Sequence, residues 1–355
     1  MVLVRPTLKR VPARVPTRKS PGAIVLADNE CPYGLLPAVV ERIAASSATT
    51  SRYPDRCAFE LLAALATHLR VPVDRIAVGA GSSELCSQLV HTVVGPGDEV
   101  VFGWQSFEAY PILTLVAGGS PVRVPLLRQG LDLDAMARAV TRRTRLVFLC
   151  NPNNPTGTAL DARALTTFAD RVPSDVLIVV DEAYREYAAA TAVPDALTLL
   201  GERPNVVVLR TFSKAYALAG LRVGYCVGSA EVIAGVRKTQ VPFSVGALAQ
   251  EAAVAALGER AEVARRIGLT LLERERVMSA LHDLGYTVPS SHANFLWLPL
   301  REESSAFAEF CMRHGVAVRS FDGEGVRVTV GLAAENSAFL SLATRWRRER
   351  PITAR

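Results

Sequence analysis

The fold of this 355-residue chain is decided by the stretch VLIVVDEAY at positions 176–184. Its five leading residues are apolar without polar alternation, which predicts a strand covered on both faces. Such strands occur in parallel sheets between two layers of helices. Asp181 then lies at the carboxyl edge of the sheet, where proteins of this class bind ligands.

Similar apolar runs recur on both sides of this stretch. We predict strands at residues 75–78, 99–102, 122–125, 146–149, 176–180, 206–209 and 223–227. Helical patterns separate several of them, at residues 83–94, 134–140 and 161–171. This alternation predicts an α/β protein with a three-layer α/β/α large domain and a mainly parallel sheet.

The pattern changes after about residue 245. Two long helical patterns, 246–257 and 259–284, are followed by strand-like segments at 294–298, 316–319 and 326–330 and a helical segment at 304–314. We therefore predict three parts: a basic N-terminal arm (1–30), a large domain (31–245) and a smaller C-terminal α+β domain (246–355).

The charge of the chain is concentrated in its arm. There are 40 Lys and Arg against 34 Asp and Glu, a formal net charge of +6, and half of all residues are apolar. This composition excludes disordered and collagen-like classes. Positions 1–20 hold six basic residues, no acid and no aromatic residue. Because base-stacking aromatics are missing, we expect no nucleic-acid binding. We expect the arm to lie along the surface of the protein.

The sequence shows neither an export signal nor a membrane span. Charges and prolines interrupt the apolar runs near the N-terminus, and no apolar segment reaches the length of a membrane helix. The six cysteines are scattered without a CxxC pair, and Cys311-x-x-His314 has no second pair to complete a metal site. We expect a cytoplasmic protein with reduced thiols and no metal.

A lysine segment, TFSKAYALAGLR at 211–222, follows the predicted strand 206–209. A lysine at this edge can form a Schiff base with a carbonyl cofactor such as pyridoxal phosphate (PLP). Arg222 and the hydroxyls of Thr211 and Ser213 can hold an anion beside Lys214. Considered alone, a lysine after a strand is more often a solvated loop charge.

Two further segments follow neighbouring predicted strands. Asp181 is costly to bury unless it meets a cation, such as a protonated pyridine nitrogen; the alternative is a helix N-cap. The NPNNPTG run at 151–157 fixes a turn and directs Asn154, or is simply a rigid turn.

A fourth segment, GAGSSE at 79–84, lies between a predicted strand and a predicted helix. Its small residues let backbone N–H groups and the helix N-terminus bind a phosphate. The rival interpretation is a GxGxxG dinucleotide site with Asp98 as its acid, but Glu84 stands where the third glycine belongs.

These four segments together resemble the fold-type I PLP-dependent aminotransferases of class I/II, in the histidinol-phosphate branch, over residues 25–345. The resemblance implies that Lys214 forms the cofactor Schiff base and moves the substrate proton, that Asp181 pairs with the pyridine nitrogen, and that Asn154 and Tyr184 bind the ring's phenolic oxygen. Phe107 is the implied stacking aromatic. The implied phosphate ligands are Gly81, Ser82, Ser83, Thr211, Ser213 and Arg222.

The resemblance also implies substrate contacts and a dimer. Arg327, in GVRVTVG at 325–331, matches the substrate arginine, whose planar fork suits a carboxylate. Family members are homodimers with composite sites, and Tyr53 resembles the tyrosine that reaches the neighbour's phosphate. The loop NECPYG at 29–34 resembles the substrate loop, with Asn29, Cys31 and Tyr33 as candidate contacts.

The implied function is transamination between an aromatic amino acid and a 2-oxo acid such as 2-oxoglutarate, with ping-pong kinetics. Three segments resemble the aromatic, phenylalanine-type enzymes: 102–112, 241–244 and 318–327. Rings available for an aromatic slot are Phe107, Tyr33, Phe243 and Phe321. The alternatives are a histidinol-phosphate aminotransferase or a specialised PLP transaminase, decarboxylase or oxidase.

The sequence departs from the aromatic branch without losing a catalytic group. Gln105 stands where arginine is usual, Ala217 and Gly246 replace Gly and Asn, and Ser320 replaces proline. These changes affect expectations of side-chain specificity. A PLP-binding regulator that uses the arm on DNA is disfavoured, because no helix-turn-helix pattern precedes residue 75.

Overall fold

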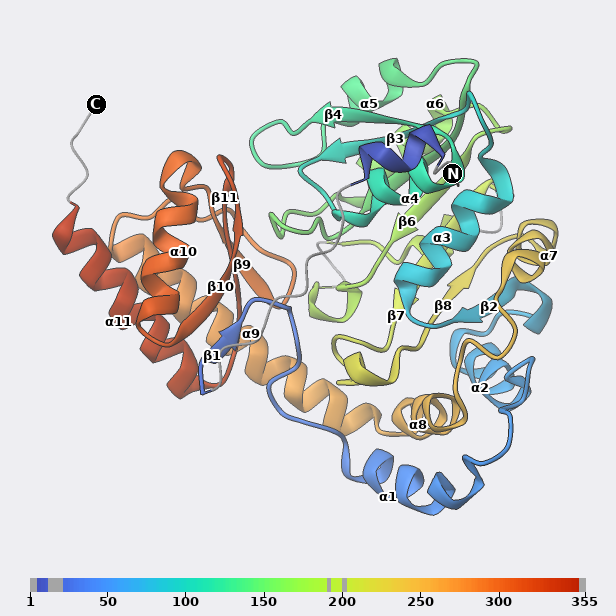
Figure 1. The fold of residues 1–355 in the computed structure, drawn as a ribbon, viewed down its shortest axis with the longest axis horizontal. Coiled ribbons are helices and arrows are strands. Elements are labelled where there is room, and N and C mark those ends of the chain that lie inside the picture. The colour runs from blue at the N-terminus through green and yellow to red at the C-terminus, as the bar shows by residue number, and fades with distance from the viewer. Residues whose placement is uncertain (1–4, 12–21, 190–192, 200–202, 351–355) are drawn as a thin grey trace, which may run out of the picture.

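Two sheets of unequal size organise the chain in the computed structural model, which describes residues 5–11, 22–189, 193–199 and 203–350 (Figure 1). The larger sheet has seven strands in the order β2-β8-β7-β6-β5-β3-β4. They are β2 (Ile76–Gly79), β3 (Glu99–Trp104), β4 (Ser120–Pro125), β5 (Thr144–Cys150), β6 (Leu177–Asp181), β7 (Val206–Thr211) and β8 (Gly224–Val227). Only β8 runs opposite to the other six strands, so the predicted mainly parallel sheet is confirmed.

Both faces of this sheet are covered. Every residue of β6 and β7 is buried, and successive residues such as Val179 and Val180 point into different apolar clusters. One cluster includes α2 (Phe59–Leu69), α5 (Leu133–Ala139), α6 (Ala162–Arg171) and α8 (Ala247–Gly258); the other includes α3 (Ser82–Val93), α4 (Ala109–Ala117) and α7 (Ala230–Thr239). The predicted three-layer arrangement follows from this double burial.

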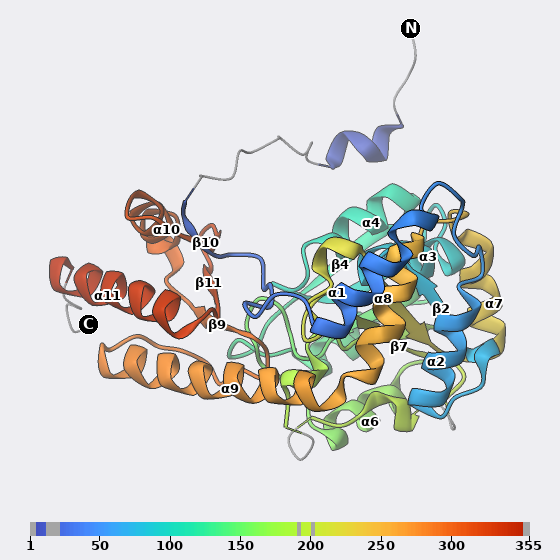
Figure 2. The same ribbon diagram turned by 90° about the horizontal axis from the view of Figure 1, so that it is seen from below.

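The smaller sheet has four strands, in the order β1-β10-β11-β9. They are β1 (Ile24–Leu26), β9 (Phe295–Leu298), β10 (Val316–Phe321) and β11 (Gly325–Thr329), packed with α10 (Ser304–Arg313) and α11 (Ala333–Glu349). The long helix α9 (Arg260–Asp283) links the two parts and runs alongside α11 at its far end (Figure 2). Val263 packs in the large core and Val277 in the small one.

Two segments lie elsewhere than the sequence pattern indicated. β1 falls within the predicted 1–30 arm, yet it pairs in parallel with β10. It is only three residues long, and the apolar run around it, 23–27, does not show which strand it pairs with. α8 falls within the predicted 246–355 domain, yet its alanine-rich face packs on α1 (Pro37–Ser46) and α2 in the large core. Periodicity predicts a helix here, but it does not predict the helix's packing partner.

The arm itself is described only over residues 5–11; residues 1–4 and 12–21 lie outside the described residues. A short 3-10 helix, Pro6–Arg10, lies beside α4 (Figure 1). The Arg5 guanidinium donates a 2.9 Å hydrogen bond to the carbonyl of Val116 near the C-terminus of α4. Across the described part of the chain, no helix has the length and hydropathy to cross a membrane.

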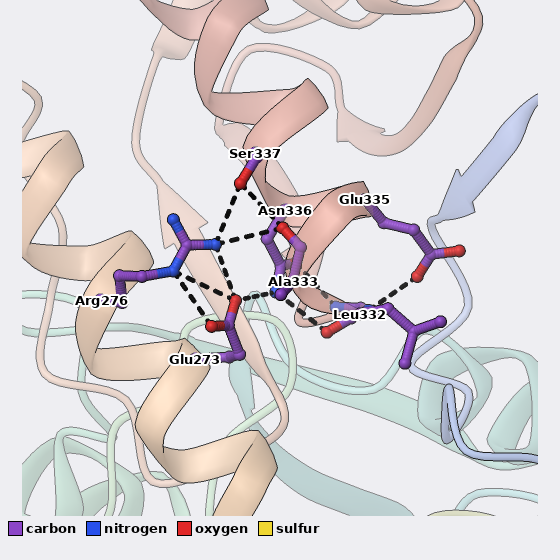
Figure 3. A network of polar contacts seen from close by, with 8 residues as sticks. Glu273, Arg276, Leu332, Ala333, Glu335, Asn336 and Ser337 are labelled. Atoms are coloured by element: carbon purple, nitrogen blue, oxygen red, sulfur yellow. Dashed lines mark hydrogen bonds and ion pairs between the residues drawn. The ribbon is translucent and has the colours of Figure 1, made fainter.

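A polar network holds the start of α11 against α9 (Figure 3). The buried Asn336 amide donates to Glu273 and to the Gly331 carbonyl, both at 2.9 Å, and accepts from the Gly331 N–H at 2.8 Å. Arg276 donates to the same Glu273 carboxylate and to the Ala333 carbonyl. The network thus satisfies backbone groups at the helix entry that would otherwise be buried unpaired.

We expect Asn336→Leu to lower the free energy of unfolding by about 1–3 kcal/mol, because it keeps the side-chain volume but leaves both Gly331 backbone groups unpaired. Chemical denaturation at fixed PLP concentration measures the change. Ser337→Ala is the matched control, since Ser337 is exposed and its two hydrogen bonds, from Arg276 and to the Ala333 carbonyl, are open to solvent; it should stay within about 0.5 kcal/mol. Equal losses in both variants would contradict the assignment.

Candidate active site

The sheet order brings three of the predicted polar segments to one edge. β5, β6 and β7 are neighbours and run parallel. Asn154 follows β5, Asp181 ends β6, and Lys214 follows β7. Because the carboxyl ends of parallel strands lie together, residues from separate parts of the chain meet here.

Lys214 is the central amine of this edge. Its Nζ donates to the Asp28 carbonyl at 3.0 Å and lies 5.8 Å from the centre of the Tyr184 ring. Burial lowers the pKa of Lys214 to about 8, and the nearby Arg327 charge acts in the same direction. A large fraction of this amine is therefore neutral near pH 8, as a nucleophile or general base requires.

Asp181 is buried among neutral donors. Its carboxylate accepts from the Tyr110 hydroxyl at 2.7 Å and from the Ala183 N–H at 3.2 Å. Burial raises the pKa of Asp181 to about 6, although the Tyr110 hydrogen bond opposes the shift. Neither of these two donors carries a charge, so the environment of Asp181 favours a cationic partner such as a protonated ring nitrogen.

Tyr184 and Asn154 are held by other side chains. The Tyr184 hydroxyl oxygen accepts from Asn29 at 2.9 Å, and its ring packs edge-on against Phe295. Burial raises the pKa of Tyr184 to about 12, so its hydroxyl keeps its proton at neutral pH. The side-chain amide oxygen of Asn154, Oδ1, accepts a hydrogen bond from the Arg327 guanidinium.

A small cradle forms between the start of α3 and Arg222. Gly81 has a φ of +81°, and a Cβ there would collide with the Arg222 guanidinium. Ser82 and Ser83 occupy the first turn of α3, where backbone N–H groups have no partner within the helix. Arg222 donates to the Ser213 hydroxyl at 3.3 Å, and Thr211 accepts from the Ser213 N–H at 3.1 Å. This combination suits a phosphate.

Arg327 projects from β11 toward the large domain. It is 8% exposed and donates to the Ala27 carbonyl as well as to Asn154. Its Nε is buried without a hydrogen-bond partner in the described part of the protein. Phe295 and Phe321 lie 5.5 and 5.8 Å from the guanidinium carbon. A largely buried guanidinium that keeps an N–H donor without a partner is suited to bind a carboxylate.

The remaining predicted residues are arranged differently. Phe107 packs edge-on against Tyr110 at 5.4 Å, close to Asp181. Tyr53 is 83% exposed and stacks on Phe243 at 4.7 Å, away from the cradle's own contacts. The Asn29 amide donates to the Tyr184 hydroxyl oxygen and accepts from the Thr329 hydroxyl of the small domain.

Cys31 and Tyr33, in the 29–34 loop, extend toward α9. The Tyr33 hydroxyl meets Thr270, and the backbone N–H of Tyr33 faces the Cys31 thiol. Burial raises the pKa of both side chains. Their contacts therefore run along α9 rather than to Lys214 or Arg327.

Sequence reasoning missed several residues of the site. No sequence pattern singles out Tyr110 as a site residue, yet its hydroxyl donates a hydrogen bond to Asp181. Glu84 was interpreted only as a departure from GxGxxG; its carboxylate accepts from the Ala80 N–H and from the Ser244 hydroxyl. The available signal was the position of Glu84 three residues after the N-cap Gly81, where a glutamate can reach back to a backbone N–H before the helix. Among the described residues, no cluster of three or more His, Cys, Asp or Glu could hold a metal.

Comparison with known proteins places this geometry in a family. The family model described as "Aminotransferase class I and II" matches residues 21–340. A Thermobifida fusca protein named aromatic amino acid aminotransferase is 52% identical over 96% of each chain. A Streptomyces coelicolor protein of the same name is 51% identical over 97% of this chain and 96% of that protein.

Solved structures agree with these matches. The crystal structure of histidinol-phosphate aminotransferase from Sinorhizobium meliloti in complex with pyridoxal-5′-phosphate has a TM-score of 0.90 and 29% identity, covering 98% of both chains. Aspartate aminotransferase from Thermus thermophilus (a tetra mutant) shares the fold at a TM-score of 0.82 and 24% identity, over 97% of this chain and 99% of that chain. Because the family match covers nearly the whole chain, this protein belongs to the class I and II aminotransferase family.

Proposed function

We propose that this aminotransferase uses PLP to move an amino group between an aromatic amino acid and a 2-oxo acid such as 2-oxoglutarate. The observation that carries the proposal is that Arg327, from the small domain, and Lys214, from the large domain, donate to consecutive backbone carbonyls, those of Ala27 and Asp28. A carboxylate-binding group and an amine of lowered pKa therefore share one site.

The residues at the sheet edge fit PLP. The cradle of Gly81, Ser82, Ser83 and Arg222 would hold the phosphate, and Asp181 would pair with the pyridine nitrogen. When bound, PLP supplies an aldehyde for exchange with amines and a ring that withdraws electrons. The fit rests on the buried carboxylate of Asp181, whose two hydrogen-bond donors are neutral.

Separate residues of the chain would then bind the substrate, transfer its proton and hold the cofactor. Arg327 binds and orients the substrate carboxylate. Lys214 accepts the substrate proton at Nζ and returns it, which its lowered pKa favours. Asn154, Tyr184 and Phe107 would hold the ring, and Thr211 and Ser213 would support the phosphate cradle.

An aromatic substrate is supported by the relatives' names and by the rings around Arg327. Phe321 packs edge-on against Trp297 at 5.5 Å and, like Phe295, borders the guanidinium. These rings offer apolar area beside the guanidinium, and the second arginine near Phe321, Arg319, is paired with Glu108 at 2.9 Å. The histidinol-phosphate alternative is supported by the names of solved structures that are at most 29% identical, such as the Sinorhizobium protein, whereas the relatives at 51–52% identity carry the aromatic name.

We further propose a cytoplasmic homodimer with small-molecule partners and no nucleic acid. The exposed Tyr53–Phe243 stack is a large aromatic surface for a single chain to leave in water. In a dimer, Tyr53 would reach the partner's phosphate cradle, and the arm would lie along the surface. The large domain would bind PLP, and the small domain would carry Arg327.

A substrate panel with 2-oxoglutarate tests the proposal. We expect kcat/KM for phenylalanine to exceed that for histidinol phosphate by at least about tenfold, since a pocket built for a ring leaves a phosphate unpaired. Glutamate formation and loss of the visible absorbance of the PLP-loaded enzyme are the two measurements. A preference for histidinol phosphate would overturn the aromatic assignment, and absence of glutamate with every amine would overturn transamination.

A further inference from the structure

Three consecutive residues after β1 connect the site groups of both domains. Arg327 donates to the Ala27 carbonyl at 2.6 Å, and Lys214 donates to the Asp28 carbonyl at 3.0 Å. The Asn29 amide donates to the Tyr184 hydroxyl oxygen at 2.9 Å. The 27–29 segment thus lies between the small-domain sheet and the large-domain site.

Asn29 is fixed by the small domain. It is 1% exposed and has a φ of +54°, a conformation that asparagine tolerates better than most residues. Its backbone N–H donates to the Thr329 hydroxyl oxygen at 2.9 Å, and its carbonyl accepts from Asn294 at 3.1 Å. Thr329 lies on β11, two residues after Arg327 and therefore on the same face of the strand.

These bonds determine which way the Asn29 amide points. The Thr329 oxygen already accepts the Asn29 N–H, and its single proton goes to Asn29 Oδ1 at 3.0 Å. Oδ1 is therefore the acceptor, and Nδ2 is the atom that faces Tyr184. The Tyr184 oxygen receives this N–H, so its own proton is directed away from Asn29 and into the site.

We propose that Asn29 is a positioning residue that fixes the direction of the Tyr184 hydroxyl proton, and that Thr329 fixes Asn29 in turn. The small domain thereby sets whether Tyr184 can donate to an acceptor in the site. This inference rests on the proposed function, in which the phenolic oxygen of PLP is that acceptor. This role differs from the substrate contact that the sequence predicted for Asn29.

Several other charged or titratable groups face Tyr184 and could also shift the absorbance midpoint, so the variants must leave them unchanged. They are Arg327 from β11, Lys214 from the loop after β7, Asp181 from β6 and Cys150 from β5. None of them is altered by substitution at Thr329. A hydrogen bond to the phenolic oxygen stabilises its negative charge, so its loss makes the bound cofactor hold its proton to higher pH.

The experiment is a pH titration of the visible absorbance of the PLP-loaded enzyme. Thr329→Val is isosteric but removes the hydroxyl, so we expect the absorbance midpoint to rise by about 0.5–1 pH unit. Asn29→Gly, which tolerates the positive φ, should raise it similarly. Thr329→Ser keeps the hydroxyl and should stay within about 0.2 unit of wild type.

Tyr184→Phe distinguishes the positioning role of Asn29 and Thr329 from the role of Tyr184 itself. It should raise the midpoint at least as far as Thr329→Val, and in the Tyr184→Phe background the Thr329→Val shift should vanish. If Tyr184→Phe moves the midpoint but Thr329→Val and Asn29→Gly do not, the positioning role is overturned. If Tyr184→Phe itself has no effect, the role of Tyr184 in the proposed function fails as well.

Discussion

Replacing Lys214 by alanine is expected to lower the rate of transamination by about 10³-fold or more. The side chain is the one amine among the described contacts of the site, and burial has lowered its pKa to about 8. The arginine side chains of the site cannot replace it as a base, because a guanidinium stays charged in proteins. Glutamate formation from phenylalanine and 2-oxoglutarate measures the loss.

The matched control is Lys238→Ala, which removes an exposed lysine from the last turn of α7 and should leave the rate within about twofold. A small primary amine added to the Lys214→Ala enzyme should restore part of the rate, because the missing function is proton transfer. An alanine variant with near-wild-type rate would rule out Lys214 as the base.

The pKa also gives the pH dependence a sign. Above about pH 8 the Lys214 amine is mostly neutral and nucleophilic, whereas below it the amine is protonated. PLP-free protein should therefore combine with PLP faster as pH rises from 7 to 9, with a midpoint near 8. A midpoint close to 10.5, the ordinary lysine value, would contradict the burial of this amine in the free protein.

The sequence predicted those parts of the site that depend on local patterns, namely apolar runs and the polar residues that follow them. Continuous apolar runs identified the strands, and Asn154, Asp181 and Lys214 follow three of those runs. Parallel neighbours bring their carboxyl ends together, so proximity could be expected without a structure. The same reasoning predicted the two-sided burial of β6 and β7.

What could not be predicted depends on contacts between distant positions. Asn29 and Thr329 are 300 residues apart, and no local pattern relates them. The sequence does not show whether Tyr110 only packs in the core or also donates to Asp181. That hydrogen bond depends on how closely α4 approaches the end of β6. The packing of α8 on α1 likewise depends on which surface its alanines meet.

A second large effect is expected from the ion pair beneath the site. Glu182, next to Asp181, is fully buried and accepts from the Arg210 guanidinium at 2.9 and 2.7 Å. Arg210 also donates to Asp195 at 2.7 Å, and Glu182 accepts the Ala196 N–H at 3.0 Å. These bonds tie both ends of the segment that carries Tyr184 to β7.

We expect Arg210→Met to lower the free energy of unfolding by about 3–5 kcal/mol, because it leaves the Glu182 carboxylate buried without its cation. Denaturation at fixed PLP concentration measures the loss. The control is Arg345→Ala, which breaks an exposed pair with Glu349 and should cost at most about 1 kcal/mol. The double variant Arg210→Met/Glu182→Gln should be more stable than Arg210→Met alone, because the fully buried charge of Glu182 is removed and only the partly exposed Asp195 loses its partner.

The pH dependence distinguishes this electrostatic cause from lost packing. Burial already raises the pKa of Glu182, and the Arg210 charge opposes that rise. Without Arg210 the folded-state pKa rises further above the unfolded value, so the folded state binds the extra proton between the two pKa values. Stability then falls as pH increases through that window. The deficit of Arg210→Met should therefore be smaller at pH 5 than at pH 8, whereas a deficit independent of pH would assign the loss to the missing side-chain contacts.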